Sequence, residues 1–341
     1  MPDARSRPLF PIIGHALAAL ILGAAFALAG ADDSHAAGRT PDSAEAKPLP
    51  VKVPPRTSRK PKKSLLNFDY PGAKPEPSTR PYSTAIANQH ISSLSLEITA
   101  LAAVSIAVGL GQWGWGESSF HVTKEGWFGK NTTYGGADKL GHAWSAHVMS
   151  DYITWRLRSM GYNGYESSIT AAILTGVAFV GVELGDGFSH YGASYEDIVA
   201  SGVGIGFSFL RNNVPGLHDK VDFRMQYMLT GHGDSLGLGD YDGKKFLLAW
   251  KLSGFDDFKD GPLRYLEIHT GYYTRGYDDP AHPTGVPKTR TAYVGLGLNL
   301  SELLFPQPGL GSTPIGWAGR ALNKYVQVPY TYVSSDGNSG R

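Results

Sequence analysis

The sequence predicts an α+β fold, in which a four-helix hydrophobic bundle is followed by a C-terminal antiparallel β region. Two observations carry this prediction. Four apolar segments of helical length each stop at a glycine or at a polar turn with proline. Beyond Asp222, the apolar residues recur at every second position instead of at helical spacing. With 42% hydrophobic and 18% charged residues, the 341-residue chain can bury a core.

The first 37 residues predict a secretory signal peptide. Arg5 and Arg7 precede an apolar run over residues 16–28, and small-residue cleavage sites follow it as far as Ala36. The run is too short to favour a spanning helix, although an uncleaved anchor is the alternative. We therefore expect an exported chain that lies in the cell envelope after cleavage, either in the periplasm or associated with a membrane.

Residues 38–84 predict a disordered linker rich in proline and lysine. Its prolines forbid a helix and favour an extended, solvated chain. A group of lysines and arginines between residues 56 and 63 gives the linker a local positive charge. We interpret it as a solvated spacer, and attraction to anionic lipid or glycan is the alternative.

The bundle is expected over residues 85–215. Its four helices are predicted at residues 94–110, 138–160, 166–184 and 195–210. These apolar runs are slightly short for a bilayer crossing of ~20 residues, so buried, membrane-dipping and tilted spanning arrangements all stay open. The last helix carries small residues on two neighbouring stripes, which let two helix backbones approach closely: Gly202 and Gly206 on one, and Ala200, Gly204 and Ser208 on the other.

The β region is expected over residues 216–305. Its strands are predicted at residues 223–229, 246–252, 265–274 and 293–300. Four strands are too few for a membrane barrel, which needs about eight, and the C-terminal Arg341 is not aromatic. We therefore expect an open antiparallel sheet packed on the helices rather than an outer-membrane strand protein. The tail, residues 306–341, is expected to be irregular.

Charge and composition exclude several classes of function. The net charge of +1 gives no reason to expect a nucleic-acid partner. The absence of cysteine excludes disulfides, thiolate metal sites, a cysteine nucleophile and a lipid attached to cysteine. The sequence also lacks the motifs of serine hydrolases, zinc peptidases and nucleotide-binding loops. The expected partner is the envelope membrane or lipid, and protein partners stay unknown.

Polar residues inside the apolar helices define a candidate site, catalytic or binding, at Asp138, Lys139, His142, Glu183, Asp186 and Asp197. Asp138 and His142 are four residues apart, so their side chains share one helix face. Glu183 follows a long apolar run, where an unpaired carboxylate would be costly. Carboxylates and an imidazole that converge in this way could bind a divalent cation or act as general acids and bases. Metal and cofactor stay open.

Each of these residues also has a purely structural interpretation. Asp138 could stabilise only the helix N-terminus, and Lys139 could be a solvated charge. His142 alone would more often be a hydrogen-bonded core histidine than a ligand. Asp197 fits a capping box that begins at Ser194, in which its side chain would reach back to the cap.

Two further histidines lie outside this set. His147 and Asp151 share a helix face that is turned about 140° from His142 at 100° per residue. We interpret them as a surface or structural pair. His190 is in a loop and could join the site.

Three strings carry a family resemblance: Gly-Gly-Ala-Asp-Lys-Leu-Gly-His at 135–142, Glu-Leu-Gly-Asp-Gly at 183–187 and Ser-Tyr-Glu-Asp at 194–197. In this order they resemble the uncharacterised YfiM-like family of bacterial periplasmic lipoproteins. More distantly, they resemble the VanZ-like membrane proteins, which include a teicoplanin-resistance protein. The match covers residues 134–210, and residues 241–304 are similar to the tail of longer members. The resemblance implies an envelope location but no established activity.

The sequence therefore predicts an exported cell-envelope protein of unknown molecular activity, with a buried Asp/Lys/His/Glu polar site. The alternative is a metal-dependent or acid–base hydrolase or transferase that acts on a lipid-linked or cell-wall substrate. A metal bound by the site would favour the enzyme. A fully salt-bridged, solvent-free cluster would favour a structural role.

Overall fold

A computed structural model describes residues 81–228, 230, 239–277, 285–307 and 309–338. The expected signal peptide and almost all of the expected linker lie outside these residues. The described chain is α+β, with helices in its N-terminal half and an antiparallel five-stranded sheet after them, so the predicted fold class is confirmed.

The four predicted helices are present and correspond to α3, α4, α5 and α6. The α-helices of the described residues are α2 Thr84–Ser93, α3 Ser95–Gln112, α4 Ala137–Ser159, α5 Gly164–Asp186, α6 Tyr195–Asn213, α7 Leu217–Lys220, α8 Leu300–Leu304 and α9 Pro314–Tyr325. The strands are β1 Val221–Tyr227, β2 Lys244–Lys251, β3 Leu266–Arg275, β4 Thr289–Leu298 and β5 Tyr332–Ser334.

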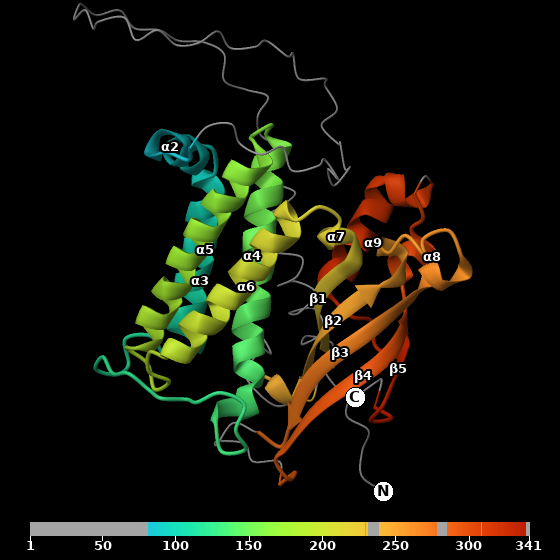
Figure 1. The fold of residues 1–341 in the computed structure, drawn as a ribbon. Helices are drawn as coiled ribbons and strands as arrows, with labels where there is room; N and C mark the ends of the chain where they lie inside the picture. Colours follow the sequence, from blue (N-terminus) through green and yellow to red (C-terminus); the bar gives the residue numbers. More distant parts are fainter. Residues whose placement is uncertain (1–80, 229, 231–238, 278–284, 308, 339–341) are drawn as a thin grey trace, which may run out of the picture.

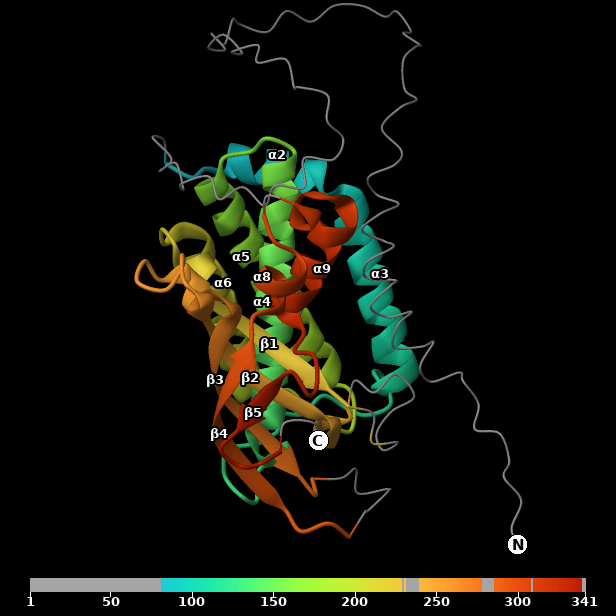
Figure 2. The same cartoon turned by 90° about the vertical axis from the view of Figure 1, so that its right-hand side faces the viewer.

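The helices and the sheet stand side by side as two layers, with α4 between them (Figure 1). Helix α4 contacts α5 and α6 on one side and β1 and β2 on the other. Ala143 of α4 packs there in one apolar cluster with Phe223 and Phe246 of the sheet. Helix α9 lies against β1, and Figure 2 shows it on the sheet side of the molecule. Helix α4 therefore carries contacts to both layers.

Helices α4 and α6 cross at a glycine. A Cβ atom on Gly204 would lie 1.9 Å from the carbonyl oxygen of Ala143, so only glycine allows this approach. Gly202 and Gly206 face open space, and a Cβ atom on either would have no neighbour within 4 Å. Of the two small-residue stripes in the sequence, the one with Gly204 makes the helix contact.

The sheet has the order β1-β2-β3-β4-β5, and every neighbouring pair is antiparallel. Strand β4 alternates between a buried and an exposed face from Tyr293 to Leu298. In β4, Val294 and Leu296 are exposed, whereas Gly295 and Gly297 between them are buried and face His269. One face of the sheet is therefore apolar and open over β4, and the other is filled.

The expectation of an irregular tail from residue 306 is wrong. Helix α9 begins there at the cap Thr313, whose side chain accepts a hydrogen bond from Gly316 N, with Pro314 in the first turn. Strand β5 adds a fifth strand through three pairings with β4. Helix α9 was not predicted because it follows a stretch rich in proline and glycine, which is typical of irregular structure. Strand β5 was not predicted because a three-residue edge strand has no periodicity to detect.

Candidate functional site

The candidate site begins at a left-handed turn before α4. Tyr134, Gly135 and Gly136 all have positive φ, at 46°, 61° and 88°. At Gly136 a Cβ would lie 2.8 Å from the backbone oxygen of Trp127, so glycine is required for both conformation and space. The hydroxyl of Tyr272 in β3 donates to Gly135 O at 2.6 Å. The sheet therefore fixes the point at which α4 starts.

Lys139, in the first turn of α4, is buried among three carboxylates. Its Nζ donates to Asp138 Oδ2 at 2.7 Å and lies 2.9 Å from Asp197 Oδ1 at the start of α6. It also forms an ion pair with Glu125, from the loop between α3 and α4. The side chain of Lys139 is only 2% exposed, so the interpretation as a solvated charge is wrong.

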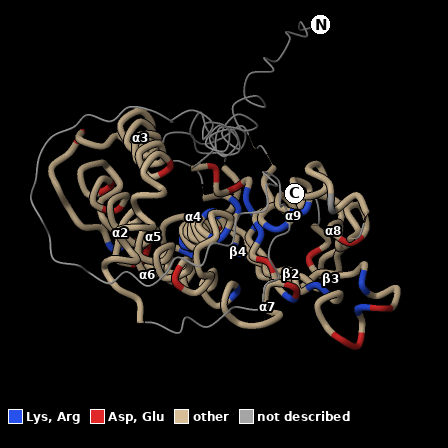
Figure 3. Tube along the Cα trace, turned by 90° about the horizontal axis from the view of Figure 1, so that it is seen from above, with Lys and Arg blue, Asp and Glu red and all other residues tan. Residues whose placement is uncertain are grey.

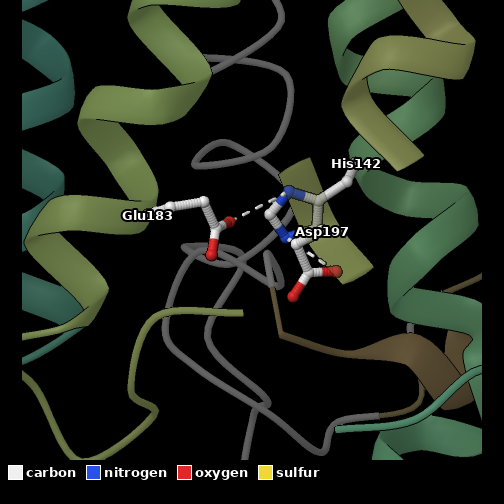
Figure 4. Close-up of side chains that lie close together, drawn as sticks. All are labelled: His142, Glu183 and Asp197. Atoms are coloured by element: carbon white, nitrogen blue, oxygen red, sulfur yellow. Dashed lines mark ion pairs between the residues drawn. The ribbon is translucent and has the colours of Figure 1, made fainter. Parts of the chain in front are cut away.

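His142 lies one turn further along α4, between the carboxylates of Glu183 and the same Asp197 (Figure 4). Its Nδ1 is 3.6 Å from Glu183 Oε1, and its Nε2 is 3.9 Å from Asp197 Oδ1. Glu183 Oε2 accepts a hydrogen bond from Ser194 N at 3.0 Å. The imidazole is 20% exposed, whereas the side chains of Glu183 and Asp197 are 4% and 6% exposed. His142 is therefore the part of this group that solvent reaches most easily.

Ser194 caps α6, but not through the predicted capping box. Its Oγ accepts from Asp197 N at 3.3 Å, as a cap should. The same hydroxyl donates to Glu196 Oε2, and Gly126 N donates to Glu196 Oε1. The carboxylate of Asp197 instead turns to Lys139 and His142. The interpretation that Asp197 serves the cap is wrong, because Glu183 accepts from the backbone N–H of Ser194 and Glu196 accepts from its hydroxyl.

Asp186 and Glu125 complete the set. Asp186, the last residue of α5, accepts a hydrogen bond from the indole of Trp115 at 2.7 Å and interacts electrostatically with His142. Glu125 was not predicted because it stands in a loop without periodicity. We call these seven residues the acid-rich cluster: Glu125, Asp138, Lys139, His142, Glu183, Asp186 and Asp197. It includes all six predicted residues; their functional role stays a prediction.

Burial and charge set the protonation of this cluster. Burial, together with the negative charge of Asp197, raises the pKa of Glu125 to about 9 despite the nearby ammonium of Lys139. Burial also raises the pKa of Asp138. For Asp197 burial acts in the same direction, but His142 and Lys139 outweigh it and lower the pKa. Burial would lower the pKa of Lys139, and its three carboxylate neighbours raise it instead. Lys139 and Asp197 are therefore ionised, whereas Glu125 keeps a proton at neutral pH.

The cluster offers two sets of ligand atoms that could hold a cation. One oxygen or nitrogen from each of His142, Glu183 and Asp197 lies within 4.8 Å of the others. The carboxylates of Glu125, Asp138 and Asp197 satisfy the same condition. Lys139 contacts all three members of the second set, so its ammonium already serves as their cation. The arrangement could bind a metal at the first set, or exchange protons along it.

His147 and Asp151 belong to a different buried group. Both residues are 0% exposed. The interpretation as a surface pair is therefore wrong, and a structural role in the protein interior is the interpretation that agrees with their burial. Asp151 accepts hydrogen bonds from Asn212 Nδ2 at 2.5 Å and from Tyr325 OH at 2.7 Å, and forms an ion pair with Lys324.

This second group joins both layers through alternating charges. Asp222 of β1 lies 2.5 Å from Arg211, 3.0 Å from Arg224 and 3.0 Å from Lys251. Arg224 in turn binds both carboxylate oxygens of Glu267, at 2.6 and 3.1 Å. We call this set the paired cluster, and its members are Asp151, Arg211, Asp222, Arg224, Lys251, Glu267 and Lys324.

Fold and site together define an α+β protein with an acid-rich group at one end of its helical layer. Residues 124–213 match the family described as "Predicted periplasmic lipoprotein (DUF2279)", whose function is unknown. The match contains every residue of the acid-rich cluster. It agrees with an exported protein of unknown activity in the periplasm or envelope. No curated protein matches the chain, and no solved structure does.

Proposed function

We propose that this chain is a membrane-embedded envelope protein whose acid-rich cluster is its working site. One observation carries the membrane part. Among the described residues, buried polar and charged side chains outnumber buried apolar ones, while many large apolar side chains are exposed. Soluble proteins bury most of their large aliphatic side chains and rarely bury charges. Apolar exteriors around polar interiors are typical of proteins that face lipid.

Helices α3 and α5 are the proposed spanning segments. By length and composition alone, both could cross a membrane, with 18 and 23 residues, and only 6% and 28% of their apolar windows are buried. A core helix of a soluble protein would be mostly buried. Val104 and Ile106 of α3 and Val177 of α5 are 50%, 52% and 67% exposed. Seen from above, α3 is almost free of charged residues, whereas charges gather between α4 and the sheet (Figure 3).

The sheet adds an exposed apolar surface of its own. Ile268, Val294, Leu296 and Leu298 are all more than 40% exposed, and they share one face of β3 and β4. The other face holds buried groups such as Glu267 and His269. The open sheet has edges and would not itself cross a bilayer, but an exposed apolar face of this kind suits contact with a membrane surface.

Sequence features support the same proposal. The expected signal peptide would export the chain. The order of Asp138, Lys139, His142, Glu183 and Asp197 resembles YfiM-like and VanZ-like proteins, and the latter are membrane proteins. The acid-rich cluster lies where the C-terminus of α5 meets the N-termini of α4 and α6. In a membrane, this end of α5 would bring the cluster to the level of the lipid head groups.

Fractionation of the full chain tests this function. We expect the chain in the membrane fraction, resistant to alkaline carbonate and released by detergent. An arginine at the exposed, lipid-facing Val177 should reduce membrane retention, since a buried arginine in lipid costs about 2.5–3.5 kcal/mol. Lys259→Arg, at an exposed side chain, is the control. A chain that carbonate releases completely would contradict the proposal.

A second candidate function is a hydrolase or transferase for a lipid-linked substrate. A shallow apolar groove of about 470 Å³ runs along the outer face of α5, from Ala172 to Leu184. The groove ends at Leu184, in the last turn of α5, so a lipid chain in it would place its head group at the end of the helix that carries the acid-rich cluster. Between two carboxylates, His142 could act as a general acid or base.

This candidate is tested with a radiolabelled polyprenyl-linked sugar and with purified peptidoglycan. We expect release of product by the full chain, its loss in His142→Gln, and its retention in Glu117→Gln, a change at an exposed loop carboxylate. Equal release by all three proteins would remove the enzymatic candidate.

A further inference from the structure

His142, Glu183 and Asp197 form a second ligand set in the acid-rich cluster, which Lys139 contacts only through Asp197. Asp197 is shared between two ligand sets of similar size, each within 4.8 Å. In one set, the ammonium of Lys139 contacts every carboxylate. In the other set Lys139 contacts only the shared Asp197, and among the described residues the ion-pair partner of Glu183 is the imidazole of His142. The geometry of the first set therefore recurs in the second, without an ammonium that contacts all of its members.

Carboxyl groups outnumber cationic groups in the acid-rich cluster. It contains five carboxyl groups against one lysine and one imidazole, and the proton on Glu125 offsets one of the five. Asp138 and Asp197 stand in the first turns of α4 and α6, where the helix dipole favours a negative charge. Glu183 and Asp186 stand in the last turn of α5, where the dipole opposes one, and that turn has no basic residue. A cation beside Glu183 would supply the compensation that its own helix does not.

The atoms between these side chains lack ordinary hydrogen bonds. Glu183 Oε1 and His142 Nδ1 are both buried, and neither has a hydrogen-bond partner among the described residues. They face each other at 3.6 Å, which is too long for a hydrogen bond. Two ligands held about 2.1 Å from one tetrahedral ion lie roughly 3.4 Å apart. The Glu183 carboxylate, 4% exposed and directed at His142, is thus placed as a metal ligand would be (Figure 4).

We propose that His142, Glu183 and Asp197 bind one divalent transition-metal ion. An imidazole with two carboxylates is a donor set for ions such as Zn²⁺ or Mn²⁺, whereas Mg²⁺ prefers oxygen ligands alone. The partial exposure of His142 gives the ion a way in. This site rests on the acid-rich cluster of the proposed function but does not depend on the membrane.

Metal binding to the purified full chain tests the site. After treatment with a chelator, the detergent-solubilised chain is titrated with Zn²⁺, Mn²⁺ and Mg²⁺ by calorimetry. We expect one equivalent of Zn²⁺ or Mn²⁺ and at least about 10-fold weaker binding in Glu183→Gln and Asp197→Asn. Glu117→Gln, an exposed carboxylate in the loop after α3, should bind as the unchanged chain does. No binding, or the same affinity in all variants, would overturn the proposal.

A spectroscopic measurement on the unchanged chain guards against variants that fail to fold. Electron spin-echo spectra of the Mn²⁺ complex should contain the ¹⁴N coupling of an imidazole ligand, and a complex with oxygen ligands alone would contradict the site. The titration needs only the purified chain. If carbonate released the protein from membranes, the membrane proposal would be refuted, but the metal titration of the purified chain would still test the metal site.

Discussion

The paired cluster and the acid-rich cluster are both buried, both charged and both attached to α4, yet they differ in balance. In the paired cluster, Asp222 alone has three cationic neighbours within 3.0 Å. In the acid-rich cluster, one ammonium serves three carboxylates, and two more carboxylates share one imidazole. The first arrangement leaves a small surplus of positive charge, whereas in the second the carboxyl groups outnumber the cationic groups.

The difference teaches which cluster holds the fold together. The paired cluster joins α4, α6, α9 and three strands, so its charges fix how the two layers meet. The acid-rich cluster joins only helix ends and a loop, and in it the carboxylate oxygens Asp138 Oδ1 and Glu183 Oε1 are buried without a hydrogen-bond partner among the described residues. Groups that weaken a fold and persist are commonly kept for function.

The largest effect is expected from breaking the paired cluster. Asp222→Ala leaves Arg211, Arg224 and Lys251 without their shared carboxylate, and the loss of one partner from a buried ion pair costs about 3–5 kcal/mol. Denaturant unfolding measures this loss. Asp256→Ala, at a 94% exposed side chain, should stay within about 0.5 kcal/mol. Equally small effects of Asp222→Ala and Asp256→Ala on stability would contradict the stabilising role of the paired cluster.

Removal of the lysine from the acid-rich cluster should have the next largest effect. Without a metal, Lys139→Met leaves the carboxylates of Glu125, Asp138 and Asp197 facing one another, at a cost of about 3 kcal/mol. Added Zn²⁺ or Mn²⁺ should restore part of this stability, because the three ligand atoms lie within 4.8 Å. Thermal melts with and without metal measure both changes, with Lys259→Met as an exposed control. A variant as stable as the unchanged chain in chelator would contradict this role for Lys139.

Two glycines of α6 provide a matched test of the helix crossing that brings the acid-rich cluster together. Gly204→Ala puts a methyl group against the carbonyl of Ala143 and should cost about 2 kcal/mol. Gly202→Ala meets open space and should stabilise the chain by about 0.5–1 kcal/mol. Chemical unfolding compares the two, and the same sign for both would mean that α4 and α6 do not meet at Gly204.

The two clusters should respond to pH in opposite directions. Lys251, Arg211 and Arg224 outweigh burial and hold the pKa of Asp222 below its usual value, so its stabilisation is lost as the pH falls below about 4. The pKa of Glu125 rises to about 9, so the folded chain keeps a proton that the unfolded chain releases. Stability should therefore fall between pH 5 and 8 by at most about 1.4 kcal/mol per pH unit for this group.

Thermal melts of the metal-free chain at pH 3, 5, 6.5 and 8 measure both the loss of stability at low pH and the loss between pH 5 and 8. We expect a maximum near pH 5, and a shallower decline toward pH 8 in Glu125→Gln. A stability that rises steadily from pH 5 to pH 8 would be the opposite of this expectation.

Much of the fold could be predicted from the sequence, because its signals are local. Apolar runs closed by Gly161 and capped by Ser194 define helices, and the change to alternating residues after Asp222 defines the sheet. The four predicted helices and four predicted strands are all present. Helix α9 and strand β5 were missed because each is stabilised by contacts with distant residues, such as the bond from Trp144 Nε1 to Tyr325 O.

The site was predictable only in part, because some of its contacts are local in sequence and others join distant residues. Helical spacing placed Asp138 and His142 on one face, and the cost of burying Glu183 implied a partner. Nothing in the spacing could show that the loop residue Glu125 reaches Lys139. Nor could it show that Glu183 and Glu196, instead of Asp197, accept hydrogen bonds from the cap residue Ser194. These contacts depend on how a loop folds back over the helix ends.

The most direct test of the difference between the clusters compares two changes of a carboxylate to its amide. Both Glu183→Gln and Asp222→Asn replace a carboxyl group by an amide and keep the shape of the side chain. In chelator near neutral pH, Glu183→Gln should leave the melting temperature unchanged to within about 2 °C, because no lysine or arginine loses a partner. Asp222→Asn should lower it, because it uncovers three cations. If Glu183→Gln lowered the melting temperature as much as Asp222→Asn does, the acid-rich cluster would be structural and the distinction between the two clusters would fail.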